Sequence, residues 1–218
     1  APAVAELTIG LILSLLRSIH LSNDELHNGK WTRYFGRRIA NCTVGIIGVG
    51  RIGSKVIQHL QAFGVDRILA TDTDPRVYSK FNQDVEWVDR ETIYRESDIV
   101  TVHVPLDHST RNMIRRREML LMKSDAIVVN ASRGGIVNEA DLADILREGH
   151  LGGAAMDVFD TEPYTGELAN IDRCLLTAYM GSMSIDCREQ MEAEATDEAV
   201  RFAAGAELKC PVPEQEYQ

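Results

Sequence analysis

The chain has 218 residues, of which 44% are hydrophobic and 26% charged, enough apolar chain for a substantial core and unlike a disordered or fibrous protein. Acidic residues (33) outnumber basic ones (23), and the formal net charge of -10 makes nucleic acid an unfavourable partner. The longest apolar run, Leu11 to Leu16 within Leu7 to Leu21, is broken by Ser14, Arg17, Ser18 and His20. A membrane-spanning helix needs ~20 apolar residues, so we expect no membrane insertion.

The cysteines indicate neither a metal site nor a disulfide framework. They share no CxxC spacing and have no histidine cluster beside them: Cys42, Cys174, Cys187 and Cys210. No basic segment precedes the first apolar run, as a secretory signal would require. We therefore expect reduced thiols, no bound metal and a cytoplasmic location.

The first 41 residues contain two different patterns. Apolar residues spaced by three and four predict one long amphipathic helix from Val4 to Ile19. The stretch 28–41 contains glycines, aromatic residues and a basic cluster without a clear period, which is typical of a connecting arm. We expect the main core to begin after this arm.

Short apolar runs alternate with helical patterns through the rest of the chain. Continuous apolar runs predict strands, buried on both faces, at 44–47, 68–71, 99–104, 126–130, 153–156 and 175–177. Helical patterns predict helices at 52–63, 89–96, 115–122, 138–148 (with Asn138 as N-cap) and 186–204, and a tail at 210–218. The alternation predicts an α/β fold, a doubly wound parallel sheet of the Rossmann type. We expect a leading helix and arm at 1–42, the sheet domain at 43–183, and a C-terminal helix and tail at 184–218.

A glycine motif lies between the first predicted strand and the helix that follows. Gly48, Gly50 and Gly53 fit GxGxxG, and Asp72 closes the next strand 19 residues after Gly53. In this context the first glycine permits a tight turn, the second lets the backbone approach a pyrophosphate, and the third lets helix and strand pack closely. A tight turn without a ligand is the alternative interpretation.

The acidic residue at the end of the second strand indicates which dinucleotide binds. An ionised Asp72 accepts hydrogen bonds from ribose hydroxyls and repels a 2'-phosphate, and Asp74 adds to that repulsion. These residues favour NAD over NADP. Arg76 points instead to NADP, since an arginine there could receive a phosphate. A solvated surface arginine is the simpler interpretation.

Several separated stretches carry a resemblance to a known family. They are Val44–Gly53, Ser97–Val100, His103–Leu106, Asn130–Gly135, Gly152–Phe159 and Glu162–Pro163. In content, order and spacing they resemble the D-isomer-specific 2-hydroxyacid dehydrogenases, the group that contains 3-phosphoglycerate dehydrogenase and the C-terminal-binding corepressors.

The resemblance covers 3–204 but only part of a family polypeptide. Family members place a substrate domain of ~100 residues ahead of the first helix, and none precedes Ala1. The resemblance thus implies a cofactor-binding fragment, from a truncated or cleaved protein rather than a naturally short one. It also implies a homodimer in which the first helix takes part.

The resemblance also assigns cofactor contacts residue by residue. Beside Gly48, Gly50 and Gly53, the positions implied are Arg51 and Ile52 at the pyrophosphate, Asp72 at the ribose, Val104, Pro105 and Thr110 along the groove, Ala131 and Arg133 beside the nicotinamide, and Asp157 at its carboxamide. Plainer interpretations stay open. Val104 and Pro105 could merely end a strand, Thr110 could cap a turn, and Asp157 could cap a loop.

The implied chemistry is hydride transfer between NAD(H) and a small 2-oxo or 2-hydroxy acid. Arg133 would pair with the substrate carboxylate, and Glu162 matches the glutamate that orients the family's catalytic histidine. The histidine itself is replaced, because the stretch matching Thr-Pro-His places Tyr179 at its position. A phenol is a poor base near neutral pH, and the loss of a positioned acid or base lowers a rate by ~100 to 10,000-fold.

Two functions remain open at this point. One is an NAD-dependent 2-hydroxyacid dehydrogenase, represented by its cofactor domain and modified at Tyr179. The alternative is an NAD-binding sensor or scaffold without redox chemistry, related to the family's corepressors. Under either hypothesis we expect no turnover by the isolated 218 residues, because half of the substrate pocket would be missing.

Overall fold

The computed structural model describes residues 1–81 and 85–211; most of the predicted tail at 210–218 lies outside this range. The chain divides into two compact units, Ala1–Gly181 and a second that begins at Ser182. The first contains the sheet and the whole glycine motif. The second contains the helix α7, Ile185–Ala203.

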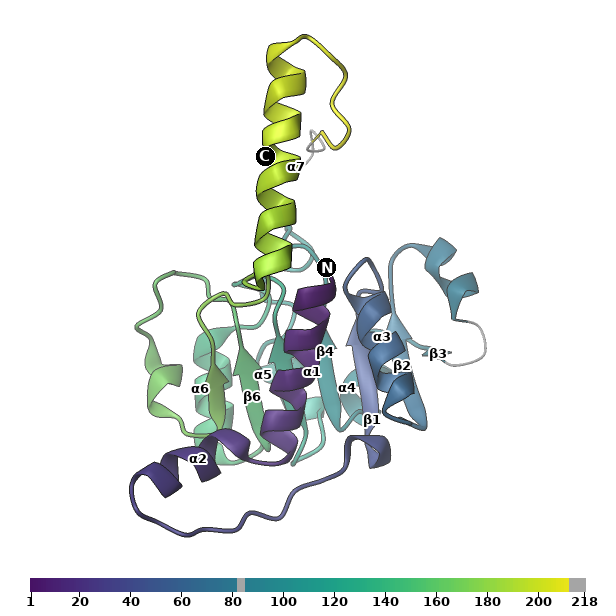
Figure 1. Ribbon diagram of the computed structural model, residues 1–218. Coiled ribbons are helices and arrows are strands. Elements are labelled where there is room, and N and C mark those ends of the chain that lie inside the picture. The colour runs from purple at the N-terminus through teal and green to yellow at the C-terminus, as the bar shows by residue number, and fades with distance from the viewer. Residues whose placement is uncertain (82–84, 212–218) are drawn as a thin grey trace. The chain divides into compact units, whose positions relative to one another are not determined.

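A parallel sheet of seven strands forms the centre of the first unit (Figure 1), in the order β3-β2-β1-β4-β5-β6-β7. The strands are β1 Thr43–Ile47, β2 Arg67–Thr71, β3 Glu86–Trp87, β4 Ile99–Val102, β5 Ile127–Asn130, β6 Gly153–Met156 and β7 Cys174–Leu176. All neighbouring pairs run parallel. The predicted doubly wound sheet is confirmed, while the short strand β3 was not predicted and β4 ends two residues earlier than expected.

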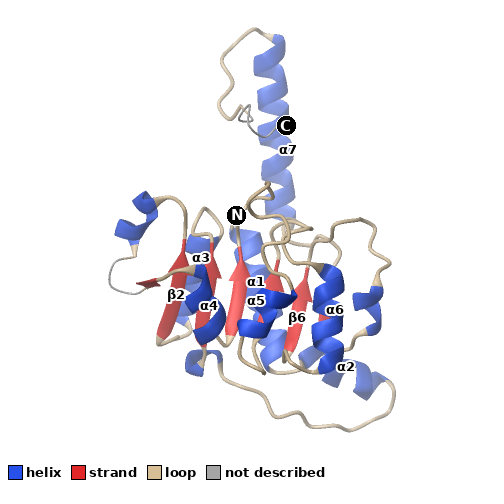
Figure 2. Ribbon diagram, turned by 180° about the vertical axis from the view of Figure 1, so that it is seen from behind, coloured by secondary structure: helices blue, strands red, loops and turns tan. Residues whose placement is uncertain are grey.

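Helices cover both faces of this sheet. One face carries α1 Pro2–Leu16 and α3 Gly53–Ala62, and Figure 2, from behind, shows α4 Arg90–Glu96, α5 Arg116–Leu121 and α6 Glu139–Glu148 over the other. The central strands are completely buried, because apolar side chains from the helices pack on each face and give two apolar clusters. Asn138 caps α6 as predicted, its side chain accepting the Asp141 N–H.

The first predicted helix is in fact two. α1 ends at Leu16, Ser18 has a left-handed backbone with a φ of 49°, and α2 runs from Ile19 to His27. The prediction of one helix from Val4 to Ile19 is therefore wrong, and Ile19 is 52% exposed. The arm packs against the break, since the Arg37 N–H donates to the Leu16 carbonyl. That bond uses a carbonyl that a longer helix would need.

Among the described residues, no single helix is long and apolar enough to cross a bilayer; α1 and α2, bent by 65° at their break, reach that length only as a pair.

Candidate functional site

The glycine loop follows β1, at the point where the strand order changes direction. β1 lies between β2 and β4, and in a doubly wound sheet a ligand binds where the connections diverge to opposite sides. Gly48 has a φ of 93°, and a Cβ there would lie 2.8 Å from the side chain of Val104, which follows β4. The loops after β1 and β4 therefore meet across this point.

The other two glycines of the motif, Gly50 and Gly53, have different surroundings. A Cβ on Gly53 would collide with the Gly48 carbonyl oxygen, so this position keeps α3 close to the loop. A Cβ on Gly50 would meet nothing within 4 Å. The space at Gly50 therefore lies free on the outside of the loop, where backbone N–H groups at the start of α3 lack intrahelical partners.

Asp72 connects the glycine loop to the end of β2. One carboxylate oxygen accepts the Val49 N–H at 2.6 Å, and the other accepts the Asp74 N–H at 2.8 Å. Each carboxylate oxygen can accept more than one hydrogen bond, so acceptor capacity remains for a ligand. The structure thus places Asp72 beside the glycine loop, as the sequence motif predicts. It also gives the carboxylate a structural role that the motif does not reveal.

The segment after β4 forms a closed turn. Thr110 donates from its hydroxyl to the Pro105 carbonyl at 2.7 Å and accepts the Asp107 N–H at 2.8 Å. The turn-capping role of Thr110, one of the two interpretations of the sequence, is therefore present. At the start of the segment, His103 lies 3.0 Å from the Thr101 hydroxyl through Nε2, and burial lowers the pKa of its imidazole to about 4.

The segment after β5 positions Ala131 and Arg133. The Asn130 side chain makes hydrogen bonds to this segment. Its Nδ2 donates to the Arg133 carbonyl, and its Oδ1 accepts from both the backbone N–H and the hydroxyl of Ser132. Ala131 is buried, whereas Arg133 is exposed. Asn130 was not predicted as a site residue, and the only signal for it was its position at the carboxyl end of a strand.

Asp157, after β6, organises the segment that carries Tyr179. Its Oδ1 accepts the Thr177 hydroxyl at 2.6 Å and the Met180 N–H at 2.7 Å, and its Oδ2 accepts the Gly181 N–H at 2.9 Å. Its own carbonyl accepts the Tyr179 N–H, and Tyr179 has a left-handed φ of 55°. The carboxylate is 1% exposed, so these bonds fix the loop, as one of the two interpretations of Asp157 proposed.

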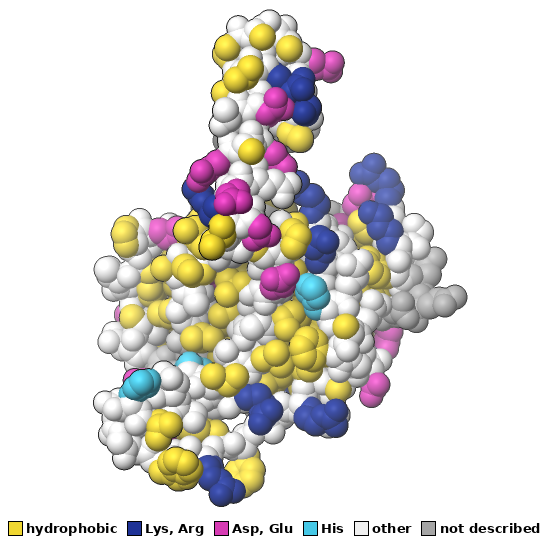
Figure 3. Space-filling view, in the orientation of Figure 1, with side chains coloured by type: hydrophobic (Ala, Val, Ile, Leu, Met, Phe, Trp, Pro, Cys, Tyr) yellow, Lys and Arg dark blue, Asp and Glu magenta, His cyan; other side chains and the backbone are white. Residues whose placement is uncertain are grey.

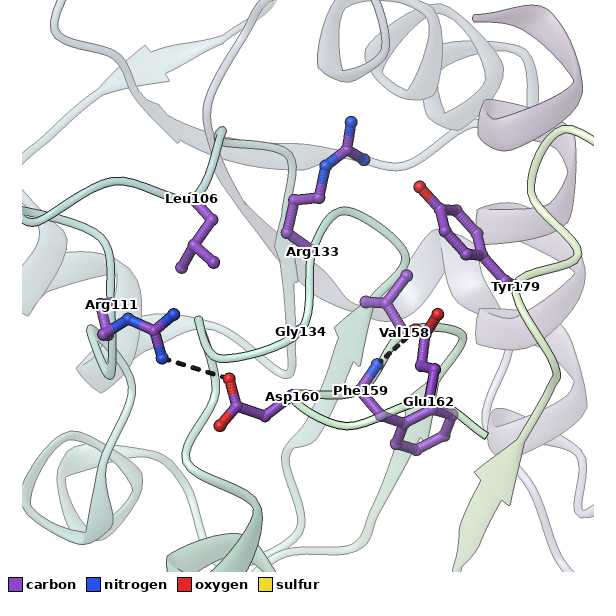
Figure 4. Close-up of a pocket in the computed structure, with 9 residues that line it drawn as sticks. All are labelled: Leu106, Arg111, Arg133, Gly134, Val158, Phe159, Asp160, Glu162 and Tyr179. Carbon is purple, nitrogen blue, oxygen red and sulfur yellow. Dashed lines mark hydrogen bonds and ion pairs between the residues drawn. The ribbon is translucent and has the colours of Figure 1, made fainter. Parts of the chain in front are cut away.

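The three residues predicted to be catalytic line one pocket, about 250 Å³ in volume (Figure 4): Arg133, Glu162 and Tyr179. Glu162 does not orient Tyr179 through a hydrogen bond in the part of the chain described. Its Oε1 instead accepts the Phe159 N–H at 3.0 Å. In Figure 4 the Tyr179 side chain projects into the pocket and Glu162 lies below its ring.

The pocket also contains an ion pair that the sequence did not suggest. Arg111 and Asp160 meet at 3.1 Å, with both side chains more than half exposed. They are 49 residues apart, so no local pattern relates them. Leu106, Gly134, Val158 and Phe159 complete the lining. The pocket thus combines two arginines, two carboxylates and an apolar wall.

Comparisons with known proteins agree with this arrangement. Residues 9–181 match the family described as "D-isomer specific 2-hydroxyacid dehydrogenase, NAD binding domain". The chain is 34% identical to a hydroxypyruvate reductase of Thermotoga maritima, over 90% of this chain and 65% of the relative. It is also 34% identical to a glyoxylate reductase of Thermococcus litoralis, over 93% of this chain and 64% of the relative.

A solved structure gives the same result for the fold. The crystal structure of D-lactate dehydrogenase with NAD+ from Lactobacillus jensenii superposes with a TM-score of 0.84 at 28% identity, covering 98% of this chain and 69% of that one. The chain thus spans about two thirds of the length of these proteins.

Proposed function

The chain belongs to the D-isomer-specific 2-hydroxyacid dehydrogenase family through its NAD-binding domain, and from this premise we propose that it is the cofactor-binding part of an oxidoreductase. The proposed reaction is hydride transfer between NAD(H) and a small 2-hydroxy or 2-oxo acid. The observation that carries the proposal is the pocket in which Arg133, Glu162 and Tyr179 meet. The two 34% identical relatives are named as reductases of such acids, which supports the substrate class.

The residues fit NAD. The open space outside Gly50 lets a pyrophosphate approach the backbone closely. The start of α3 supplies N–H donors for that pyrophosphate, and the Asp72 carboxylate supplies an acceptor for ribose hydroxyls. We propose Arg51 and Ile52 as further pyrophosphate contacts. Val104, Pro105, Thr110, Ala131 and Asp157 are the proposed contacts along the rest of the groove. When bound, the reduced nicotinamide supplies the hydride.

Arg133 is the proposed substrate-binding residue. Its guanidinium fork can pair with a carboxylate through two parallel hydrogen bonds and place a positive charge near the carbonyl that is reduced. The side chain is exposed and its backbone carbonyl is held by Asn130. One terminal nitrogen donates to the Ser132 carbonyl at 2.7 Å, which leaves the other N–H donors of the guanidinium for a ligand in the pocket. Only the carboxylate shared by all 2-oxo acids is recognised in this way, so selectivity among acids is assigned to other residues.

Tyr179 is the proposed hydrogen-bond donor to the substrate oxygen. A phenol O–H can donate a hydrogen bond to a developing alkoxide, but it is a poorer proton donor than an imidazolium and, while protonated, cannot take up the proton of a hydroxy acid. Glu162 lines the same pocket as Tyr179, and we propose that it takes part in the reaction there. We therefore expect slow turnover, with reduction favoured over oxidation.

The alternative function, an NAD-binding sensor or scaffold without redox chemistry, rests on Tyr179 alone. Neither named relative is of that kind. The two functions share NAD binding and differ in turnover. NADH oxidation with glyoxylate or hydroxypyruvate by the complete protein supports the enzyme, and no oxidation at high enzyme concentration supports the scaffold. The isolated 218 residues should give none in either case.

A homodimer and a cytoplasmic location are also proposed. Support for the dimer comes from large exposed apolar side chains on α2 and the arm, including Trp31 at 84% and Phe35 at 104% exposure; Figure 3 shows apolar side chains over α1 and along the lower edge. Gel filtration at micromolar concentration tests the dimer, and a monomer would contradict it. The free state of all four cysteines supports a reducing compartment.

A further inference from the structure

The end of β2 carries an arrangement that the glycine motif does not require. Asp74 lies two residues after Asp72 and donates its backbone N–H to the Asp72 carboxylate. The Asp74 carboxylate caps the short 3-10 helix Pro75–Lys80, accepting the Arg76 N–H at 3.0 Å. The same carboxylate holds the Arg76 guanidinium, with Nε at 2.8 Å from Oδ1 and the terminal nitrogen at 2.8 Å from Oδ2. The pair therefore uses both carboxylate oxygens.

Arg76 is otherwise free to move. Its side chain is 88% exposed and, among the described residues, bonds to Asp74 alone. The Arg76 backbone N–H also donates to Asp74, and the Arg76 carbonyl accepts the Ser79 hydroxyl. The pairing holds the pKa of Asp74 below its usual value, so the carboxylate stays charged at neutral pH. An exposed ion pair of this kind is weak. It therefore competes poorly with a stronger anion unless other charges oppose that anion.

We propose that Arg76 is a latent binding residue for a ribose 2'-phosphate, withheld from that role by Asp74. The inference rests on the proposed function, since it assumes that NAD(H) binds at the glycine loop. Asp72 supplies the acceptor for an unmodified ribose, and Asp74 adds a second negative charge beside it. Together they reject a phosphate that carries up to two negative charges. Asp74 also occupies the guanidinium fork that would otherwise pair with that phosphate.

Substituting Asp74 tests its contribution to the rejection of the 2'-phosphate separately from that of Asp72. Asp74→Asn removes the charge and releases Arg76, while an asparagine caps a helix as well as an aspartate does. Glu91→Gln is the matched control, because it breaks another solvent-exposed carboxylate–arginine pair, with Arg95 on α4, and changes the net charge by the same amount. Asp74→Asn combined with Arg76→Ala distinguishes the release of Arg76 from the loss of a negative charge.

The experiment is calorimetric titration of the chain with NADH and with NADPH at low ionic strength. We expect the unmodified chain and Glu91→Gln to bind NADH more tightly than NADPH. Asp74→Asn should tighten NADPH binding at least fivefold and change NADH binding less than threefold, and Arg76→Ala in the same chain should remove the gain.

Three results would overturn the inference while NADH still binds. They are a gain for NADPH below fivefold in Asp74→Asn, a gain that survives Arg76→Ala, and equal binding of NADH and NADPH by the unmodified chain. If no variant, nor the unmodified chain, binds NADH, the proposed function fails together with the inference.

Discussion

The Asp72 carboxylate accepts the backbone N–H of Val49 at 2.6 Å. This contact joins the end of β2 to the glycine loop after β1, so the residue proposed to hold the ribose also fixes the loop proposed to hold the pyrophosphate. A charge-assisted bond to a backbone N–H is stronger than a neutral one. The two halves of the cofactor site are therefore positioned by each other before any ligand binds.

The first prediction separates ligand binding from folding within the glycine loop. Gly50→Ala should leave the free energy of unfolding within ~0.5 kcal/mol of the original, because a Cβ there meets nothing. It should weaken NADH binding at least tenfold, because the methyl group occupies the approach to the pyrophosphate. Urea denaturation and NADH titration of the same sample measure the two quantities.

Gly53→Ala should behave in the opposite way. Its Cβ would collide with the Gly48 carbonyl oxygen, and relieving such an overlap costs ~1–3 kcal/mol of stability. The unfolding midpoint in urea should fall. If Gly53→Ala were as stable as the original chain, the close packing of α3 on the loop would be contradicted.

The second prediction concerns Asp157. In Asp157→Asn, an amide nitrogen would face the Thr177 hydroxyl and the Met180 N–H, or the Gly181 N–H. A buried donor without an acceptor costs ~1–3 kcal/mol, and we expect that loss in urea denaturation. Asp66→Asn, at an exposed position, is the control and should change stability little. Equal effects of the two substitutions would refute the positioning role of Asp157.

The third prediction concerns Tyr179. Tyr179→His in the complete protein should raise the rate of 2-oxo acid reduction about 100-fold or more, since a positioned acid contributes that much. Tyr179→Phe, which keeps the ring and removes the hydroxyl, should lower it. Steady-state NADH oxidation measures both. An unchanged rate in both variants would remove Tyr179 from the reaction.

The fourth prediction is a pH dependence. Burial lowers the pKa of His103 from 6.5 to about 4, so the unfolded chain takes up a proton before the folded one as pH falls. The stability contribution is complete above pH 6.5 and decreases from there toward pH 4. At pH 5 the loss amounts to about 2 kcal/mol. His103→Gln should lose less stability than the original chain between pH 7 and pH 5 in urea denaturation, and identical losses would contradict the prediction.

Local signals were enough to predict the glycine loop and the sheet. The roles of Gly48, Gly50 and Gly53 depend on backbone geometry that the motif specifies, and continuous apolar runs mark strands buried on both faces. The break after Leu16 was missed because apolar spacing continues through Ile19, while the helix ends where the arm takes the Leu16 carbonyl. β3 was missed because it is short and lies at the sheet edge.

The contacts within the site were harder to predict because they join distant segments. Asp157 and the loop at 177–181 lie some 20 residues apart, and the Arg111–Asp160 pair spans 49 residues. Neither pair shares a helix or a strand. The sequence could name Arg133, Glu162 and Tyr179 only through their likeness to a family, and the pocket that unites them requires the folded chain.

Titration of this chain with NADH by calorimetry is the most direct test of the cofactor site. We expect saturable heat with one site per chain, and binding at least tenfold weaker in Gly50→Ala. Heat that never exceeds dilution up to millimolar NADH, in a sample that unfolds cooperatively, would contradict it.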